Sequence, residues 1–337
     1  PKPRAKLAPR HAPPIRLRAS NIGRLIYMGR ASEKGRISRR AIVAGAGAAG
    51  LAGVATALYR TAPSFWKQYA RDLGRPVVQP PARPNPAQWS DTGIHAAWLG
   101  HSTVLLKIDG FTILTDPVFS GRAGLDLGLF TLGVKRLVEP ALAIDELPPI
   151  DLILLSHAHM DHLDVASLGE LENKATTVVT ARATSDLFRA DHYKETRELG
   201  WEERTRVGPL TLKSFRVNHW GARMRSDTYR GYNAYTIEAG RHRILFGGAT
   251  AATDAFRGVR GSKPFDLAIM PIGAYDPWVR YHCTPEQALQ MGGDARAEFF
   301  IPVHHQTFPL SREPMHEPIE RFYNAAVNQL NNAVQIF

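Results

Sequence analysis

The chain has 337 residues, enough for one large domain or two smaller ones, and its 44% hydrophobic and 22% charged residues are typical of a globular protein. Its net charge of +11 is unevenly placed, because residues 1–60 contain 13 of the 42 Lys and Arg residues and only one acid, Glu33. The rest of the chain is close to neutral, which argues against a basic surface and against nucleic acid as a partner. The single cysteine, Cys283, excludes an intrachain disulfide.

Residues 1–60 are predicted to form a disordered basic arm followed by an export segment. The first 36 residues are rich in Pro, Arg and Lys, and Ser38-Arg39-Arg40 then precedes the uncharged, Ala- and Gly-rich stretch Ala41–Leu58. This arrangement resembles a twin-arginine signal. Because no clean cleavage site follows, removal and retention as a membrane anchor both stay open. We predict export to the periplasm, or anchoring at the inner membrane facing it, over a cytoplasmic location with a buried helix.

Residues 61–95 are predicted to be a helical and proline-rich linker, with five prolines between Pro76 and Pro86. Residues 96–337 then form the domain that carries the chemistry. Its first strand patterns, Thr103–Ile108 and Phe111–Thr115, flank Asp109-Gly110, which strongly favours a two-residue hairpin.

Strand and helix patterns alternate through the rest of the domain. Further strands are predicted at Thr176–Val179, Leu210–Phe215, Ala234–Ala239, Ile244–Gly247, Leu267–Pro271 and Phe299–Val303. Helices are predicted at Ser167–Glu172, Ala181–Arg189, Pro285–Met291, capped by Thr284, and Glu317–Leu330. Early hairpins and later strand–helix alternation predict an α/β (α+β) fold of two packed sheets with outer helices.

The stretch from Leu154 to Asp164 is the strongest signal for chemistry. It holds His157, His159 and His162 together with the carboxylates Asp161 and Asp164, just beyond the apolar segment 150–155, which is predicted to be a buried strand. Imidazole and carboxylate ligands together suit zinc, with iron or manganese as alternatives. His157 and His159 can point the same way, whereas Asp161 and His162 point apart, so two neighbouring ions could be bound. A solvated polar loop is the competing interpretation.

Further candidate ligands stand after later strands, in Asn218-His219-Trp220-Gly221 and Pro302-Val303-His304-His305. The order His157-x-His159-x-Asp161-His162, then His219, then His304 resembles the metallo-β-lactamase fold superfamily. The resemblance implies its four-layer αββα sandwich. Four other stretches, spread between Ala96 and Phe308, are similar to the family of N-acylphosphatidylethanolamine-hydrolysing phospholipases D and its bacterial relatives: Trp98–Thr103, Leu114–Phe119, Glu146–Asp151 and Pro271–Pro277.

The resemblance implies two zinc ions. Carried over by position, it makes His157, His159 and His219 the ligands of the first ion, and Asp161, His162 and His304 those of the second. The family's bridging carboxylate belongs to a Gly-Asp-Thr motif, but this chain has Gly248-Ala249-Thr250 at that place. Ala249 cannot bind a metal, so the repulsion between two dications is less offset and the second ion is expected to bind more weakly.

Three explanations for Ala249 stay open: an engineered Asp-to-Ala change that silences the enzyme, a natural enzyme with one ion or a weakly held pair, and a natural loss of activity. Asp254 is too far along the chain to replace the bridge without rebuilding the loop, and a helix cap or solvated acid is its simpler role.

The resemblance also suggests roles for residues beside the ligands. Asp161 and His282 receive catalytic roles, with His282 facing the substrate, although a buried structural histidine is the alternative. Asp116 and Asp164 are expected to orient ligand imidazoles or brace the site loops, or else to cap turns. For His101, on the first loop, we expect a structural hydrogen bond.

For a lipid phosphodiester, the resemblance implies cleavage on the head-group side to phosphatidic acid and an amide alcohol. A phospholipid or other small phosphodiester is then the substrate and a membrane surface the expected partner. Tyr275, Trp278 and Phe308 are candidates to line an apolar channel, although aromatic residues also serve as core. Hydrolysis of a lactone, sugar phosphate or amide, and a non-catalytic ligand-binding role, are the rival functions. The oligomeric state stays open, a homodimer included.

Overall fold

The structure is a computed structural model that describes residues 63–126 and 131–329. The predicted basic arm and export segment lie outside the described residues. The first described element is helix α2 (Pro63–Leu73), followed by the short 3-10 turn η1 (Pro86–Gln88). Among the described helices, none combines the length and hydropathy needed to cross a membrane.

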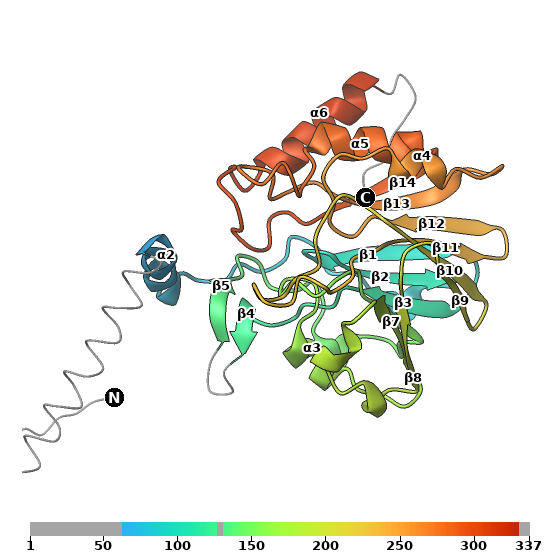
Figure 1. The fold of residues 1–337 in the computed structure, drawn as a ribbon, viewed down its shortest axis with the longest axis horizontal. Coiled ribbons are helices and arrows are strands. Elements are labelled where there is room, and N and C mark those ends of the chain that lie inside the picture. Colours follow the sequence, from blue (N-terminus) through green and yellow to red (C-terminus); the bar gives the residue numbers. More distant parts are fainter. Residues whose placement is uncertain (1–62, 127–130, 330–337) are drawn as a thin grey trace, which may run out of the picture. The chain divides into compact units, whose positions relative to one another are not determined.

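Two six-stranded sheets form the centre of the domain (Figure 1). In the first sheet, the strand order is β1-β2-β3-β6-β7-β8, antiparallel from β1 to β3 and parallel from β3 to β8. Its strands are β1 (Ile94–Gly100), β2 (Thr103–Ile108), β3 (Phe111–Thr115), β6 (Leu152–Leu154), β7 (Thr177–Ala181) and β8 (Glu195–Leu199).

The second sheet has the order β14-β13-β12-β11-β10-β9, parallel from β12 to β14 and antiparallel elsewhere. Its strands are β9 (Arg204–Val207), β10 (Leu210–Phe215), β11 (Ala234–Ala239), β12 (His242–Phe246), β13 (Phe265–Pro271) and β14 (Ala297–Val303). A separate hairpin pairs β4 (Arg122–Asp126) with β5 (Thr131–Lys135).

Apolar side chains from both sheets interdigitate in the main core, for example Leu106 and Ile113 from the first sheet with Ile237 and Ile269 from the second. Helices cover the outer faces, with α4 to α6 on the second sheet and α3 on the first (Figure 1). The helices are α3 (Val165–Glu170), α4 (Ala255–Gly258), α5 (Pro285–Asp294) and α6 (Glu317–Gln329), and the remaining 3-10 turns are η2 (Ile144–Glu146), η3 (Ser185–Leu187) and η4 (Ala190–His192). The predicted two-sheet αββα fold is confirmed.

Local chain chemistry explains the elements that were predicted well. Asp109 and Gly110 both have positive φ, +45° and +85°, as a type I′ hairpin requires. Thr284 caps α5 as predicted, because its side chain accepts a hydrogen bond from the Gln287 N–H while the Gln287 side chain returns to the Thr284 N–H.

The helix predicted over Ala181–Arg189 is wrong. Strand β7 continues to Ala181, and Ala183 has a φ of +58° that stops a right-handed helix. The carboxylate of Glu198 accepts hydrogen bonds from the N–H groups of Ala183, Thr184 and Ser185. A partner from the neighbouring strand β8 therefore satisfies donors that a helix would have used.

Candidate metal centre

The candidate ligands each lie beyond the carboxyl end of a strand, and their donor atoms gather in two clusters. The histidine-rich stretch follows β6, His219 follows β10 and His304 follows β14. β10 and β14 both run parallel to β12, so their carboxyl ends lie at one edge of the second sheet. Sites in such sheets form at these ends.

The first donor set consists of three imidazole nitrogens. His157 Nε2 lies 2.9 Å from His159 Nδ1 and 3.2 Å from His219 Nε2, and the latter two nitrogens are 3.3 Å apart. Donors at a zinc–nitrogen distance of about 2.05 Å in a tetrahedral shell are separated by about 3.3 Å. The three nitrogens therefore have the spacing that one divalent ion requires.

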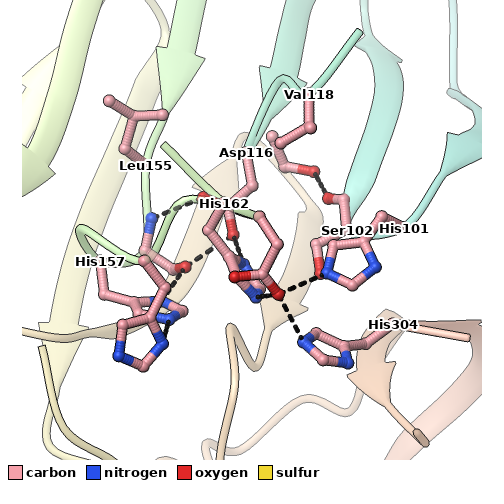
Figure 2. Close-up of polar contacts among 12 residues, drawn as sticks. His101, Ser102, Asp116, Val118, Leu155, His157, His162 and His304 are labelled. Carbon is pink, nitrogen blue, oxygen red and sulfur yellow. Dashed lines mark hydrogen bonds and ion pairs between the residues drawn. The ribbon is translucent and has the colours of Figure 1, made fainter. Parts of the chain in front are cut away.

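The second donor set surrounds a carboxylate oxygen, Asp161 Oδ2. It lies 3.4 Å from His304 Nε2, 3.6 Å from His162 Nε2 and 2.9 Å from His101 Nε2. Figure 2 shows His101, His162 and His304 close together. The Nε2 atoms of His162 and His304 are buried without a hydrogen-bond partner. Because an unsatisfied buried nitrogen is costly, these two atoms fit a metal ion.

The two predicted supporting carboxylates lie beside the ligands. Asp116 is buried, and its carboxylate accepts hydrogen bonds from the N–H and hydroxyl of Ser156 and from Nδ1 of His162, at 2.7, 2.6 and 2.7 Å (Figure 2). Its position suits the orientation of an imidazole ligand. Asp164 instead accepts from the Ser120 N–H and the Ser167 hydroxyl, and so connects the start of α3 to the loop after β3.

Burial keeps the imidazoles in the neutral form that binds metals. It lowers the pKa of His162 to about 3 and that of His159 to about 4, and it holds those of His157 and His219 well below their ordinary value.

The two buried carboxyl groups shift in opposite directions. Burial acts to raise the pKa of Asp161, but the neighbouring imidazoles of His162, His101 and His304 outweigh it and hold that pKa well below its ordinary value. Asp161 is therefore anionic. Burial raises the pKa of Asp116 to about 8, against the lowering effect of the Ser156 hydrogen bonds.

The position at which the resemblance implies a bridging carboxylate is closely packed. Ala249 is 3% exposed and follows Gly248, whose φ is +59°. A Cβ at Gly248 would lie 2.8 Å from the Asn233 carbonyl oxygen and 3.0 Å from the Ser156 Cβ. The loop therefore packs directly beside the residue before His157. Asp254 does not replace the bridge, because its carboxylate is 87% exposed and pairs with Arg257 at 3.3 Å.

His282 lies between the two donor sets. Its ring centroid is 5.2 Å from that of His219 and 5.1 Å from that of His304, and its Nδ1 is buried without a partner. Burial keeps its pKa well below the ordinary value, so the ring is neutral. The neighbouring Cys283 thiol is buried with a pKa raised by burial to about 12, which disfavours a thiolate nucleophile.

The three predicted channel residues have different environments. Phe308 lines a cavity of about 190 Å³ that His304 and Met315 also border. Tyr275 is buried and donates its hydroxyl to Glu317 at 2.8 Å, outside that lining, whereas Trp278 is 50% exposed. Of the three predicted channel residues, only Phe308 borders this cavity.

Sequence reasoning did not include two other groups beside the ligands. Trp220 is 44% exposed and its ring lies 5.0 Å from that of His159, and Tyr281, 43% exposed, accepts the Nδ1–H of His219 with its carbonyl oxygen. In the sequence, Trp220 follows His219 and Tyr281 precedes His282, and this adjacency could have indicated that both lie beside the site. The expected hydrogen bond of His101 is present, and its partner is the candidate ligand Asp161.

Comparisons with known proteins agree with this geometry. A family model described as "Beta-lactamase superfamily domain" matches residues 112–305, more than half of the chain. An uncharacterised protein of Mycobacterium tuberculosis is 34% identical over 272 residues, covering 77% of this chain and 72% of that protein. N-acyl-phosphatidylethanolamine-hydrolyzing phospholipase D 1 of Caenorhabditis elegans is 31% identical over 240 residues, covering 66% of each protein.

Among solved structures, a possible metal-dependent hydrolase of Veillonella parvula superposes with a TM-score of 0.57 at 17% identity, covering 73% of this chain and 97% of that chain. This likeness supports the fold alone. The family match and the paired donor sets identify the chain as a metal-dependent hydrolase that belongs to the β-lactamase superfamily.

Proposed function

We propose that this chain is a zinc-dependent phosphodiesterase of the phospholipase D type that acts on N-acylphosphatidylethanolamine-like phospholipids. The observation that carries the proposal is the pair of adjacent donor sets beside a rim of exposed aromatic side chains, Trp220, Trp278 and Tyr281. A relative named for hydrolysis of this lipid class, 31% identical over 240 residues, supports the substrate.

Nitrogen and carboxylate donors at this spacing suit Zn²⁺, with iron or manganese as alternatives. His157, His159 and His219 would hold one ion, and Asp161, His162 and His304 the other. A bound divalent ion supplies two effects, since it lowers the pKa of water and polarises a phosphoryl oxygen. The neutral His282, which lies between the donor sets, is placed to orient a phosphate oxygen by hydrogen bonding.

The mouth of the site offers apolar surface for a lipid. The exposed side chains of Trp220 and Tyr281 lie 5.9 Å apart, and the Tyr281 N–H donates to the Trp278 carbonyl oxygen within the same turn. Trp278 and Val279 are 50% and 49% exposed. Large exposed aromatic residues are characteristic of contact with membrane interfaces. We therefore propose a phospholipid surface as the partner.

We further propose that the protein acts in the periplasm or on the periplasmic face of the inner membrane, as the paired arginines before Ala41–Leu58 suggest. We also propose that the chain has reduced activity as it stands. With Ala249 in place of a carboxylate, Asp161 is the only anion in the two donor sets, so a second dication is less well compensated.

The test uses the purified full chain, loaded with zinc and incubated with a bacterial lipid extract to which N-acylphosphatidylethanolamine is added. Mass spectrometry should detect phosphatidic acid and the matching N-acylethanolamine, and a chelator should abolish both. A chromogenic phosphodiester and a lactone serve as parallel substrates. Turnover of the lactone without either phosphodiester would overturn the proposal in favour of the rival hydrolase.

A further inference from the structure

His101 contacts two candidate ligands of the second ion from one position in the chain. It lies in the turn between β1 and β2, is 1% exposed, and its Nε2 is 2.9 Å from Asp161 Oδ2. Its carbonyl oxygen accepts the backbone N–H of His304 at 2.8 Å. Asp161 follows β6 in the first sheet and His304 follows β14 in the second, so His101 connects ligands from both sheets.

The backbone of His101 is held in an unusual conformation. Its φ is +49°, in the left-handed region that few residues other than glycine adopt, and its N–H donates to the Thr307 hydroxyl at 2.7 Å. Such a conformation persists only where the surroundings over-determine it. Here hydrogen bonds through the N–H, the carbonyl oxygen and the side chain fix the ring against Asp161.

The hydrogen bonding of the ring distinguishes a ligand from a supporting residue. In the second donor set, the Nε2 atoms of His162 and His304 are buried without a hydrogen-bond partner and lie 3.6 and 3.4 Å from Asp161 Oδ2, whereas His101 Nε2 lies 2.9 Å from it, at hydrogen-bond distance. His101 Nδ1 is buried without a partner. Because a carboxylate oxygen is an acceptor, the imidazole nitrogen at 2.9 Å from Asp161 Oδ2 must donate an N–H to it. The proton therefore belongs on Nε2.

We propose that His101 is a positioning residue for the second metal ion, donating its Nε2–H to Asp161 while its carbonyl oxygen holds the His304 backbone. Because Ala249 supplies no bridging charge, Asp161 is the sole anionic donor of both sets, and its orientation carries more of the second ion's affinity. The proposal goes beyond the proposed function, since it concerns the metal centre whichever bond is hydrolysed.

Two substitutions at His101 distinguish a positioning residue from a metal ligand. The amide of His101→Gln can place an N–H near the Nε2 position but is a poor zinc ligand, whereas the side chain of His101→Asn tolerates positive φ but is too short to reach Asp161. Zinc content and chelator competition on the full chain should show a second ion bound about 10–100-fold more weakly in His101→Asn. His101→Gln should stay within about threefold of the parent chain, with the first ion unchanged in both.

Equal affinities in His101→Asn and the parent chain would overturn the proposal. A loss in His101→Gln as large as in His101→Asn would also overturn it, because it would make the ring itself a ligand. His305→Gln is the matched control, since this buried imidazole pairs with the Pro302 carbonyl oxygen and does not touch Asp161. Thermal melting of the metal-free variants checks that each is folded.

A measurement on the unsubstituted chain tests the same proposal without a variant. In ¹⁵N-histidine NMR of the zinc-loaded protein, the His101 ring should have a proton on Nε2. An Nε2 with the chemical shift of a metal-bound nitrogen would overturn the proposal. Neither readout depends on the substrate, so failure here and failure of the lipid assay are distinguishable.

Discussion

The Nδ1 of His162 lies 2.7 Å from Oδ2 of Asp116, and both residues are completely buried. Because Asp116 accepts this proton, it fixes the His162 tautomer that leaves Nε2 available for a metal. Asp116→Asn replaces one acceptor oxygen with an N–H₂ group that competes with the Ser156 donors. We expect the second ion to bind about 10–100-fold more weakly, measured by chelator competition.

Asp164→Asn is the control for this change, because Asp164 hydrogen-bonds Ser120 and Ser167 and no ligand imidazole. An equal loss of metal affinity in both variants would argue for general loosening of the loops rather than for a specific role of Asp116.

Restoring a carboxylate at position 249 should strengthen the second metal site. Two dications repel each other, and a carboxylate held between them would offset part of this repulsion. We expect Ala249→Asp to raise both zinc content and the phosphodiesterase rate, the latter at least about tenfold. Ala249→Asn, of similar volume but uncharged, should give neither gain. Equal zinc and equal rates in Ala249→Asp and the parent chain would contradict the importance of the bridge.

Gly273 allows the loop that carries His304 to approach closely. A Cβ at this position would lie 2.1 Å from the His304 carbonyl oxygen. Gly273→Ala should therefore displace His304, weaken the second ion at least about tenfold and lower stability by about 1–3 kcal/mol. Gly293→Ala in α5 is the matched control, because nothing lies within 4 Å of a Cβ there. Metal titration and denaturant unfolding check both; an unchanged Gly273→Ala variant would refute the close approach.

The metal-free chain should lose stability as the pH falls below about 6.5. Burial lowers the pKa of His101 and His162 to about 3 and that of His159 to about 4, so only the unfolded state takes up these protons between pH 6.5 and 4. The free energy of unfolding then falls by up to about 1.4 kcal/mol per pH unit for each proton. The pKa of Asp116 is raised to about 8, so the folded state holds one extra proton there and this group stabilises the fold as the pH falls. It opposes the effect of the histidines by one proton only.

Urea unfolding of chelator-treated protein at pH 7, 6 and 5 measures this slope. His305→Gln removes another buried imidazole whose pKa burial lowers to about 4. The free energy of unfolding of this variant should therefore fall less steeply with pH, by up to about 1.4 kcal/mol per pH unit. Stability that is flat or rises between pH 7 and 5 would show that the histidines are already protonated in the folded state.

The exposed aromatic rim should matter for lipid in vesicles more than for a soluble substrate. Trp278→Ser removes a half-exposed apolar side chain from the rim, and we expect the ratio of vesicle to soluble phosphodiester turnover to fall about tenfold. Tyr323→Ser on α6, with 57% of the tyrosine exposed, is the control surface change and should leave the ratio unchanged. A similar fall in both variants would remove the case for a membrane-facing rim.

The sequence determined most elements and the composition of the site, because both depend on local pattern. The Asp109-Gly110 hairpin and the Thr284 cap arise from backbone preferences of neighbouring residues. The donors could be grouped because each follows a predicted strand and because their order resembles that of the metallo-β-lactamase fold superfamily. His157 to His162, His219 and His304 were therefore predictable as one site.

The tertiary structure decided what depends on contacts between distant segments. Glu198, from the next strand, turned a predicted helix after Ala181 into a short 3-10 turn by accepting its N–H groups. The partner of His101 lies 60 residues away, so only the folded chain assigns this imidazole to Asp161. Local preferences fix turns and strands, whereas the partner of a buried polar group is selected by which surfaces pack together.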